Sequence, residues 1–411
     1  MKVESAIILL CIFFMGVSAE EILMPGELWE SGYITVRGTG NELFYYLVRS
    51  RDRSPSAPLV IWLNGGPGCS SAYGLFTELG PYMVNRTDNK FWKNEWSWNN
   101  KYDMLFVDQP VQVGFSLVKD DDSLCINQTC VVNDFYTFLL KFVEKYPQYY
   151  GRPLYVSGES YGGHYVPSIS ARLARVQNPA LNLKGVVVGN PFTSMSAQMG
   201  AYPYYLYENK NFSTIEYVLA KAAMVTCQIG HLVGLEKVLL TQICDFSLAH
   251  LQNLPNGYDI REKADYDDTT LIKTLNDTAV REMLGVKKKK MSLCNDTIYN
   301  LFSVDLATSV SFEIEYLISH KIDVMLYFGN KDFMCNWRGG EALVNSFQWY
   351  GNEGFSKLDL KEWFIGKKAV GKYKKYEYLN FLMVYDAGHL VPMDQPEAAY
   401  EMITRFINKS Y

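Results

Sequence analysis

Short runs of consecutive apolar residues recur along the chain, and several of them end in asparagine, glycine or proline. The run at 59–63 leads into Asn-Gly-Gly-Pro-Gly, and the run at 104–107 leads into Asp-Gln-Pro. Comparable runs lie at 154–156, 186–188, 323–328 and 381–385. Strands that are apolar on both faces and alternate with helical stretches are typical of a parallel sheet covered by helices. The pattern therefore predicts an α/β fold, with a final helix at 396–407.

The pattern of the chain changes between residues 193 and 308. Aromatic and polar residues crowd together there, and glycine becomes rarer. We interpret this stretch as an inserted helical cap. The predicted organisation is a signal peptide at 1–19, a core in two parts at 20–192 and 309–411, and the cap at 193–308 between them.

The first residues have the pattern of a secretory signal peptide. Lys2 precedes an apolar run at 6–17, and the small residues Ser18 and Ala19 offer a cleavage site after Ala19. The run is short for a membrane span, although an uncleaved anchor remains an alternative. No later segment is apolar enough to cross a bilayer, so we expect no membrane span once the signal is removed.

Cysteines and glycosylation sequons agree with export. Removal of Cys11 with the signal leaves an odd number of cysteines, which in an oxidising compartment indicates disulfides and one remaining thiol. Sequons of the N-x-S/T type occur at Asn85, Asn127, Asn211, Asn276, Asn295 and Asn408. Together these features favour a glycoprotein of the secretory pathway that is lysosomal, vacuolar or extracellular.

The composition indicates whether nucleic acid is a partner of this protein. The chain is 48% hydrophobic and 15% aromatic, as expected for a globular protein, and its formal net charge is −5. An acidic balance argues against nucleic acid as a partner. The oligomeric state is left open, with a homodimer as one possibility.

The stretch 158–163 reads Gly-Glu-Ser-Tyr-Gly-Gly and follows the apolar run at 154–156. Residues 165–176 after it can form a helix, so the G-x-S-x-G motif lies between a strand and a helix. This is the context of a nucleophile elbow, in which a turn so tight requires small residues around the exposed serine. The alternative is an ordinary glycine-bearing turn with a solvated serine. Ser160 is the candidate nucleophile.

Two further candidates follow later strands. Asp332 comes after the run at 323–328, and His389 comes after the run at 381–385. Ligands of open α/β sheets bind at the carboxyl ends of the strands, and the order Ser, Asp, His is that of α/β-hydrolases. His389 would act as the base and Asp332 would orient it. We therefore predict an α/β-hydrolase fold: a mostly parallel central sheet, helices on both faces and an inserted helical cap.

Several motifs carry a resemblance to the serine carboxypeptidases. They are W-L-N-G-G-P-G-C-S-S at 62–71, D-Q-P-V-Q-V-G-F-S at 108–116, G-E-S-Y-G-G-H-Y-V-P at 158–167, D-F-M-C-N-W at 332–337 and G-H-L-V-P at 388–392. The similarity runs from about residue 32 to the end and is weakest in the cap. The resemblance implies a serine-type carboxypeptidase that hydrolyses C-terminal residues from peptides and proteins by an acyl-enzyme mechanism, with no metal and no cofactor.

The family's site residues carry over by motif. Ser160, Asp332 and His389 match its triad, and the backbone N–H groups of Gly66 and Tyr161 match its oxyanion hole. The resemblance assigns binding of the substrate's terminal carboxylate to Asn64, Glu78 and Glu159. Crowded carboxyl groups raise each other's pKa, so one or both glutamates can hold a proton and donate it. An acidic pH optimum follows.

The resemblance also implies a disulfide pattern. Cys69 and Cys294 match the family's long-range bridge, and Cys335 matches its free thiol near the active site. The remaining pairs are then Cys227 with Cys244 and Cys125 with Cys130. A cysteine nucleophile at Cys335 is an alternative, but Cys335 lacks the elbow that Ser160 has.

Some positions depart from the yeast member of the family. They are Tyr73, Thr77 and Leu390, and in addition Asn330 stands where an acidic residue is frequent in the family. These departures leave open which side chain the leaving residue carries. Two other functions stay open as well. One is an acyltransferase on the same fold, against which both glutamates argue, and the other is a glycoprotein that stabilises a partner, against which the intact triad argues.

Overall fold

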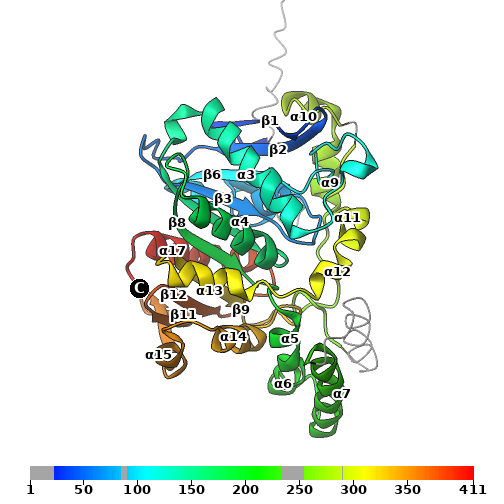
Figure 1. Ribbon diagram of the computed structural model, residues 1–411, viewed down its shortest axis with the longest axis vertical. Coiled ribbons are helices and arrows are strands. Elements are labelled where there is room, and N and C mark those ends of the chain that lie inside the picture. The colour runs from blue at the N-terminus through cyan, green and yellow to red at the C-terminus, as the bar shows by residue number, and fades with distance from the viewer. Residues whose placement is uncertain (1–22, 85–89, 233–253, 289) are drawn as a thin grey trace, which may run out of the picture.

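The computed structural model describes residues 23–84, 90–232, 254–288 and 290–411. Ten of the described strands form one sheet that runs through the molecule (Figure 1). In spatial order they are β1 (Trp29–Arg37), β2 (Asn41–Val48), β6 (Asp103–Asp108), β3 (Leu59–Leu63), β7 (Pro153–Glu159), β8 (Asn182–Gly189), β9 (Asp323–Gly329), β12 (Leu379–Val384), β11 (Lys368–Tyr376) and β10 (Lys361–Ile365). The short strands β4 (Tyr82–Val84) and β5 (Phe91–Lys93) form a separate pair.

The six central strands, from β6 to β12, pair in parallel. Each of them contains one of the apolar runs seen in the sequence, so the predicted parallel sheet is confirmed. The outer strands β1, β2, β10 and β11 pair antiparallel and were not predicted. Antiparallel edges extend the sheet without changing the carboxyl ends of the central strands, where the candidate residues lie.

Alternating side chains of the buried strands feed two apolar cores. Ile61 and Leu63 of β3 face one core, while Val60 and Trp62 face the other. The first core is covered by α3 (Gln128–Lys145), α4 (Gly162–Val176), α13 (Ser311–Ser319) and α14 (Trp337–Ser346). The second is covered by α2 (Ala72–Thr77) and α17 (Pro396–Ile407), together with α9 (Thr269–Asn276) and α10 (Thr278–Met283). Helices therefore lie on both faces, as predicted.

The described elements between β8 and β9 are all helical. Besides α9, α10 and α13 they are α5 (Met195–Gln198), α6 (Tyr202–Glu208), α7 (Thr214–Leu232), α11 (Asp296–Leu301) and α12 (Ser303–Leu306). Figure 1 shows α5, α6 and α7 at one end of the molecule, and α9, α11 and α12 along its side. The exact division into core and cap stays a prediction.

Two short helices complete the second half of the chain, α15 (Asn352–Ser356) and α16 (Val391–Asp394). Single 3₁₀ turns lie at Trp98–Asn100, Asp121–Ser123, Pro147–Tyr149 and Met199–Ala201. Within the part of the chain that the structure describes, no helix is long and apolar enough to cross a membrane. The predicted signal peptide lies outside the described residues.

Two disulfides join the expected partners. Cys69 in the glycine-rich loop is bonded to Cys294, which lies 225 positions later, and Cys125 is bonded to Cys130. Cys335 is a free, buried thiol. The proposed pairing of Cys227 with Cys244 lies outside the described residues, because Cys244 and the side chain of Cys227 are not described. The long-range bridge fastens the segment before α11 to the loop that follows β3.

Candidate active site

Ser160 lies in a tight turn between β7 and α4. Its φ is +58°, in the left-handed region that a residue with a side chain seldom adopts. The turn is held by hydrogen bonds from Ser160 N to Gly189 O (3.0 Å) and from Phe192 N to Ser160 O (2.9 Å). A Cβ at Gly158 would lie 2.3 Å from Leu63 O, so only glycine permits β7 to approach β3 so closely here. The predicted elbow geometry is present.

The glycine-rich loop after β3 packs directly against this elbow. A Cβ on Gly65 would lie 2.4 Å from the backbone nitrogen of Tyr161 and 2.7 Å from Glu159 O. Gly66 follows with a φ of +103°, which favours glycine. Within the described structure, neither the Gly66 N–H nor the Tyr161 N–H donates a backbone hydrogen bond. The loop thus packs beside the elbow, and Gly66 lines the same cavity as Ser160.

His389 and Asp332 form a buried pair at the ends of β12 and β9. His389 Nδ1 lies 2.7 Å from Asp332 Oδ2, and both side chains are almost fully buried. His389 Nε2 is buried and has no hydrogen-bond partner in the described part of the molecule. Because Nδ1 is occupied by the carboxylate, Nε2 is the nitrogen left to exchange a proton with another group.

Asn190, which the sequence did not single out, holds the same aspartate. It follows β8 with a φ of +42°, and its Nδ2 donates to Asp332 Oδ2 at 2.5 Å. Asp332 Oδ1 accepts from the backbone N–H of Cys335 at 3.1 Å. Asparagine is among the few residues that adopt positive φ readily, so an asparagine directly after a strand is the one sequence signal that could have drawn attention to it.

A segment of the predicted cap clamps the loops that carry the histidine and the aspartate. His389 N donates to Tyr258 O at 2.7 Å, and Met334 N donates to Gly257 O at 2.8 Å. The Tyr258 ring lies 4.9 Å from the imidazole ring, centre to centre. This segment therefore helps to fix the positions of the two strand-end loops.

Asn64, Glu78 and Glu159 meet in one buried cluster. Asn64 Oδ1 accepts from Trp62 Nε1 and from Gly74 N, both at 2.9 Å, which fixes the orientation of the amide. Asn64 Nδ2 then donates to Glu159 at 2.8 Å and to Glu78 at 3.3 Å. The three side chains come from β3, from the end of α2 and from the elbow, and the fold brings them together as predicted.

The electrostatics of this cluster favour a bound proton. Burial raises the pKa of Glu78 to about 7, although hydrogen bonds to Glu159 and Asn64 act in the opposite direction. Burial and then the charge of Glu78 raise the pKa of Glu159 well above its usual range. One outer oxygen of each glutamate is buried with no donor in the described structure. Two carboxyl groups this close share protons as a pair.

One cavity of about 160 Å³ is lined by both Ser160 and His389.

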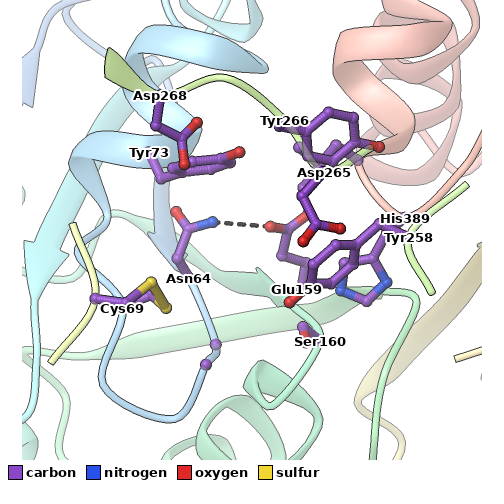
Figure 2. A pocket seen from close by; sticks show the side chains of 14 residues that line it. Asn64, Cys69, Tyr73, Glu159, Ser160, Tyr258, Asp265, Tyr266, Asp268 and His389 are labelled. Atoms are coloured by element: carbon purple, nitrogen blue, oxygen red, sulfur yellow. Dashed lines mark hydrogen bonds between the residues drawn. A yellow bond between two sulfur atoms is a disulfide. The ribbon is translucent and has the colours of Figure 1, made fainter. Parts of the chain in front are cut away.

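Asn64 and Glu159 are the members of the buried cluster that line this cavity. Figure 2 shows Ser160 at its base, the Asn64–Glu159 hydrogen bond across its middle and His389 at its side. Four further lining residues come from the predicted cap: Tyr258, Asp265, Tyr266 and Asp268. No sequence motif points to these four residues, because they lie in an irregular polar stretch.

Two groups of described residues have three potential metal-ligand atoms within 4.8 Å of one another. In the first, Cys125 and Cys130 are joined in a disulfide and cannot act as thiolates. In the second, Asp332 and His389 bind each other, and burial raises the pKa of the Cys335 thiol well above its usual range. A protonated thiol is a poor ligand, so neither group has the chemistry of a metal centre. That the protein needs no cofactor stays a prediction.

The predicted glycosylation sites differ in accessibility. Asn127 and Asn408 are exposed, whereas Asn211, Asn276 and Asn295 are half-buried. Asn276 Nδ2 donates to two backbone carbonyl groups, and Asn295 Nδ2 donates to Gln112 O. Asn85 lies outside the described residues. Glycosylation stays a prediction, with Asn127 and Asn408 as the more accessible sites.

The fold and the site together define a class. A mostly parallel sheet covered by helices, with a serine at a strand-to-helix elbow and an aspartate and a histidine after later strands, is the architecture of the α/β-hydrolases. The solved structure of Kex1(delta)p, a prohormone-processing carboxypeptidase from Saccharomyces cerevisiae, has the same fold. It matches with a TM-score of 0.84 at 24% sequence identity, over 95% of this chain and 94% of that chain.

Sequence comparison narrows the class to one family. The family model described as serine carboxypeptidase matches residues 25–409. The chain is 34% identical over 397 residues to serine carboxypeptidase-like 49 of Arabidopsis thaliana, covering 92% of this chain and 77% of that protein. It is 33% identical over 409 residues to carboxypeptidase Y of Komagataella phaffii, covering 93% and 76% respectively. The chain belongs to the serine carboxypeptidase family, and it is a serine-type carboxypeptidase.

Proposed function

We propose that the protein removes residues from the C-termini of peptides through an acyl-enzyme formed on Ser160. The observation that carries this proposal is the orientation of His389. Its Nδ1 is bound to Asp332, while its Nε2 has no partner and the imidazole lines the same cavity as Ser160. An imidazole held in this way can take a proton from a serine and return it to a leaving amine.

The reaction has two halves. Ser160 Oγ attacks the carbonyl carbon of the last peptide bond while His389 Nε2 takes its proton. His389 then gives this proton to the leaving nitrogen, the C–N bond breaks, and the terminal amino acid leaves. A water molecule attacks the resulting ester with His389 again as base, which releases the shortened peptide and restores Ser160. Asp332 orients the imidazole and stabilises its charged form throughout.

The N–H groups of Gly66 and Tyr161 form the oxyanion hole in this proposal. Negative charge develops on the carbonyl oxygen when Ser160 attacks, and fixed donors stabilise it without reorganisation. Both N–H groups lie where the glycine-rich loop meets the elbow, and neither donates a backbone hydrogen bond in the described structure. Because neither N–H group donates a backbone hydrogen bond in the described structure, both are available to the oxyanion, which supports this role.

Asn64, Glu78 and Glu159 bind the terminal carboxylate of the substrate. The amide of Asn64 is one donor, and a protonated glutamate is the second. Because burial raises the pKa of both glutamates, the pair keeps a proton in acid and loses it as the pH rises. Deprotonation removes a donor and places negative charge beside an anionic substrate. Peptide hydrolysis should therefore have an acidic optimum.

The protein is proposed to act in the secretory pathway, in a lysosomal or vacuolar compartment or outside the cell. The apolar N-terminal run and the sequons support this route. The disulfides Cys69–Cys294 and Cys125–Cys130 support it too, because such bonds persist in oxidising compartments.

A labelling and digestion experiment tests the function. A fluorophosphonate, which reacts with activated serines, should label a peptide that contains Ser160, and a label on another serine would contradict the assignment. A free-acid peptide should yield a ladder shortened from its C-terminus, while internal cleavage would contradict exopeptidase action. If an added alcohol captured most of the acyl group in dilute solution, the protein would instead be an acyltransferase.

A further inference from the structure

The cavity that contains Ser160 has an acidic wall on the side away from the nucleophile. Its lining includes Asp265 and Asp268, in addition to Glu159, and none of its described lining residues is lysine or arginine. The cavity also contains buried polar atoms with no partner in the described structure, on Glu159 and His389. The two aspartates thus belong to a cavity that is already built to receive a ligand.

Asp268 immediately precedes α9, where an acidic residue usually serves as a helix cap. Its side chain makes no capping hydrogen bond. The neighbouring Asp267 does so instead, since its carboxylate accepts from Thr269 N at 3.0 Å. Asp268 is half-buried and accepts a hydrogen bond from the phenol of Tyr73. Its carboxylate is therefore directed to the cavity wall and not to the helix.

Tyr73 connects this wall to the carboxylate-binding cluster. The charges of Asp268, Glu78 and Glu159 all act on its phenol, so these groups lie around one ring. Figure 2 shows Tyr73 and Asp268 beyond Asn64, with Asp265 and Tyr266 across the cavity. Asp265 is exposed at the rim, where its Oδ1 accepts from Asn256 at 2.9 Å.

The covalent structure of a peptide substrate determines which of its groups reaches the acidic wall of the cavity. The carboxylate and the side chain of the last residue branch from the same carbon atom. When the carboxylate is bound at Asn64 and Glu159, the side chain must extend into the adjoining part of the cavity. A long side chain that leaves the cluster on the side of Tyr73 enters the part of the cavity that Asp268 and Asp265 line.

We propose that this cavity selects peptides whose last residue is lysine or arginine, with Asp268 and Asp265 as the counter-charges of the cationic side chain. The inference rests on the proposed function, because it assumes that Asn64 and the glutamates bind the terminal carboxylate. Tyr73 contributes an aromatic face along the aliphatic part of the side chain and holds Asp268 in place. Charged hydrogen bonds in a partly desolvated pocket give more selectivity than apolar contacts of similar size.

Matched peptides test the proposal directly. One series ends in arginine or in citrulline, which has nearly the same shape without the charge, and a second ends in lysine or norleucine. We expect kcat/KM for arginine to exceed that for citrulline by about tenfold or more, the effect of one charge-assisted hydrogen bond. Asp268→Asn and Asp265→Asn should each lower this ratio, and the double variant should bring it near one.

Asp267→Asn is the matched control. It removes the same charge from the same loop, and asparagine also caps helices, but Asp267 does not line the cavity. The control should keep the wild-type ratio. An arginine-to-citrulline ratio near one in the wild-type protein, or an equal loss of the ratio in all three variants, would overturn the inference. If no peptide with a free C-terminus were cleaved, the proposed function itself would fail.

Discussion

Asn190 donates a 2.5 Å hydrogen bond to Oδ2 of Asp332, the same oxygen that binds His389. The aspartate is thus held from two sides, by an amide at the end of β8 and by the imidazole after β12. An aspartate that orients a catalytic histidine must itself be fixed, because a small rotation of its carboxylate moves the imidazole away from the serine.

Replacement of Asn190 should therefore slow the chemical step. Asn190→Gly removes the amide and keeps a residue that accepts positive φ. We expect kcat to fall by about tenfold to a hundredfold, the effect of losing a hydrogen bond to a charged group, with little change in KM. Steady-state kinetics on one peptide measure both constants. An unchanged kcat in the folded variant would show that Asn190 does not position the catalytic aspartate.

Ser160→Ala should abolish hydrolysis while it preserves binding. Without the nucleophile, kcat should fall on the order of 10⁵-fold or more, as loss of a triad member does in other serine enzymes. Peptide affinity, measured by calorimetry, should stay close to the wild-type KM, since Asn64 and the glutamates are untouched. Turnover near the wild-type rate in a pure, folded variant would exclude Ser160 as the nucleophile.

The long-range disulfide should contribute strongly to stability. Cys69 and Cys294 are separated by 225 positions, and a bridge that closes a long loop stabilises a protein by roughly 2–5 kcal/mol. Cys69→Ser with Cys294→Ser should lower the free energy of unfolding by about this amount. The short Cys125–Cys130 bridge, replaced in the same way, is the control and should cost less. Peptide mapping without reduction should also find Cys335 unpaired, and a disulfide at Cys335 would contradict the structure.

Stability should decrease from acid to neutral pH. Burial raises the pKa of Glu78 to about 7 from an ordinary value of 4.5, and it also raises the pKa of Glu159 well above its usual range. A carboxyl group whose pKa is higher in the folded state stabilises the fold fully below its unfolded pKa. The contribution is lost as the pH rises through the folded value. At about 1.4 kcal/mol per pKa unit, the shift of Glu78 corresponds to a loss on the order of 3 kcal/mol, which belongs to the coupled pair and not to Glu78 by itself.

Denaturant titrations at about pH 4.5, 6 and 8 give the free energy of unfolding at each pH. The linkage relation predicts how this free energy should fall. The double variant Glu78→Gln, Glu159→Gln has no carboxyl group to titrate in the cluster, so its stability should depend less on pH. If the free energy of unfolding changed equally with pH in the wild-type protein and in the double variant, the pair would not hold its proton in the folded state.

The sequence predicted the central sheet well, because its strands are buried on both faces. Runs such as 59–63 are recognisable without any knowledge of their neighbours, and β3 has these same bounds. The strands β1, β2, β10 and β11 were missed. The residues of β1, β10 and β11 are partly exposed, which weakens their apolar pattern. β2 is buried almost throughout, so its apolar run was a signal in the sequence that was overlooked.

Site residues could be predicted where a sequence motif requires a particular backbone conformation. The other site residues could not be predicted from the sequence. The elbow glycines and Gly66 have positions that other residues would not fit. Asn190 and Tyr258 reach the site through contacts that span more than 100 positions of sequence, and no short pattern records such contacts. The acidic wall is a further case, since Asp265 and Asp268 resemble ordinary helix-start residues until the fold places them in the cavity.

The central claim is that a protonated pair of glutamates recognises the C-terminus of the substrate. The most direct test is KM as a function of pH for one peptide and its C-terminal amide, in the wild-type protein and in the Glu78→Gln, Glu159→Gln variant. We predict that KM for the peptide rises as the pH passes the raised pKa of the pair, while KM for the amide changes little. The variant, which keeps permanent donors, should show a flat KM for both. A wild-type KM for the peptide that stays constant from acid to mildly alkaline pH would contradict this account.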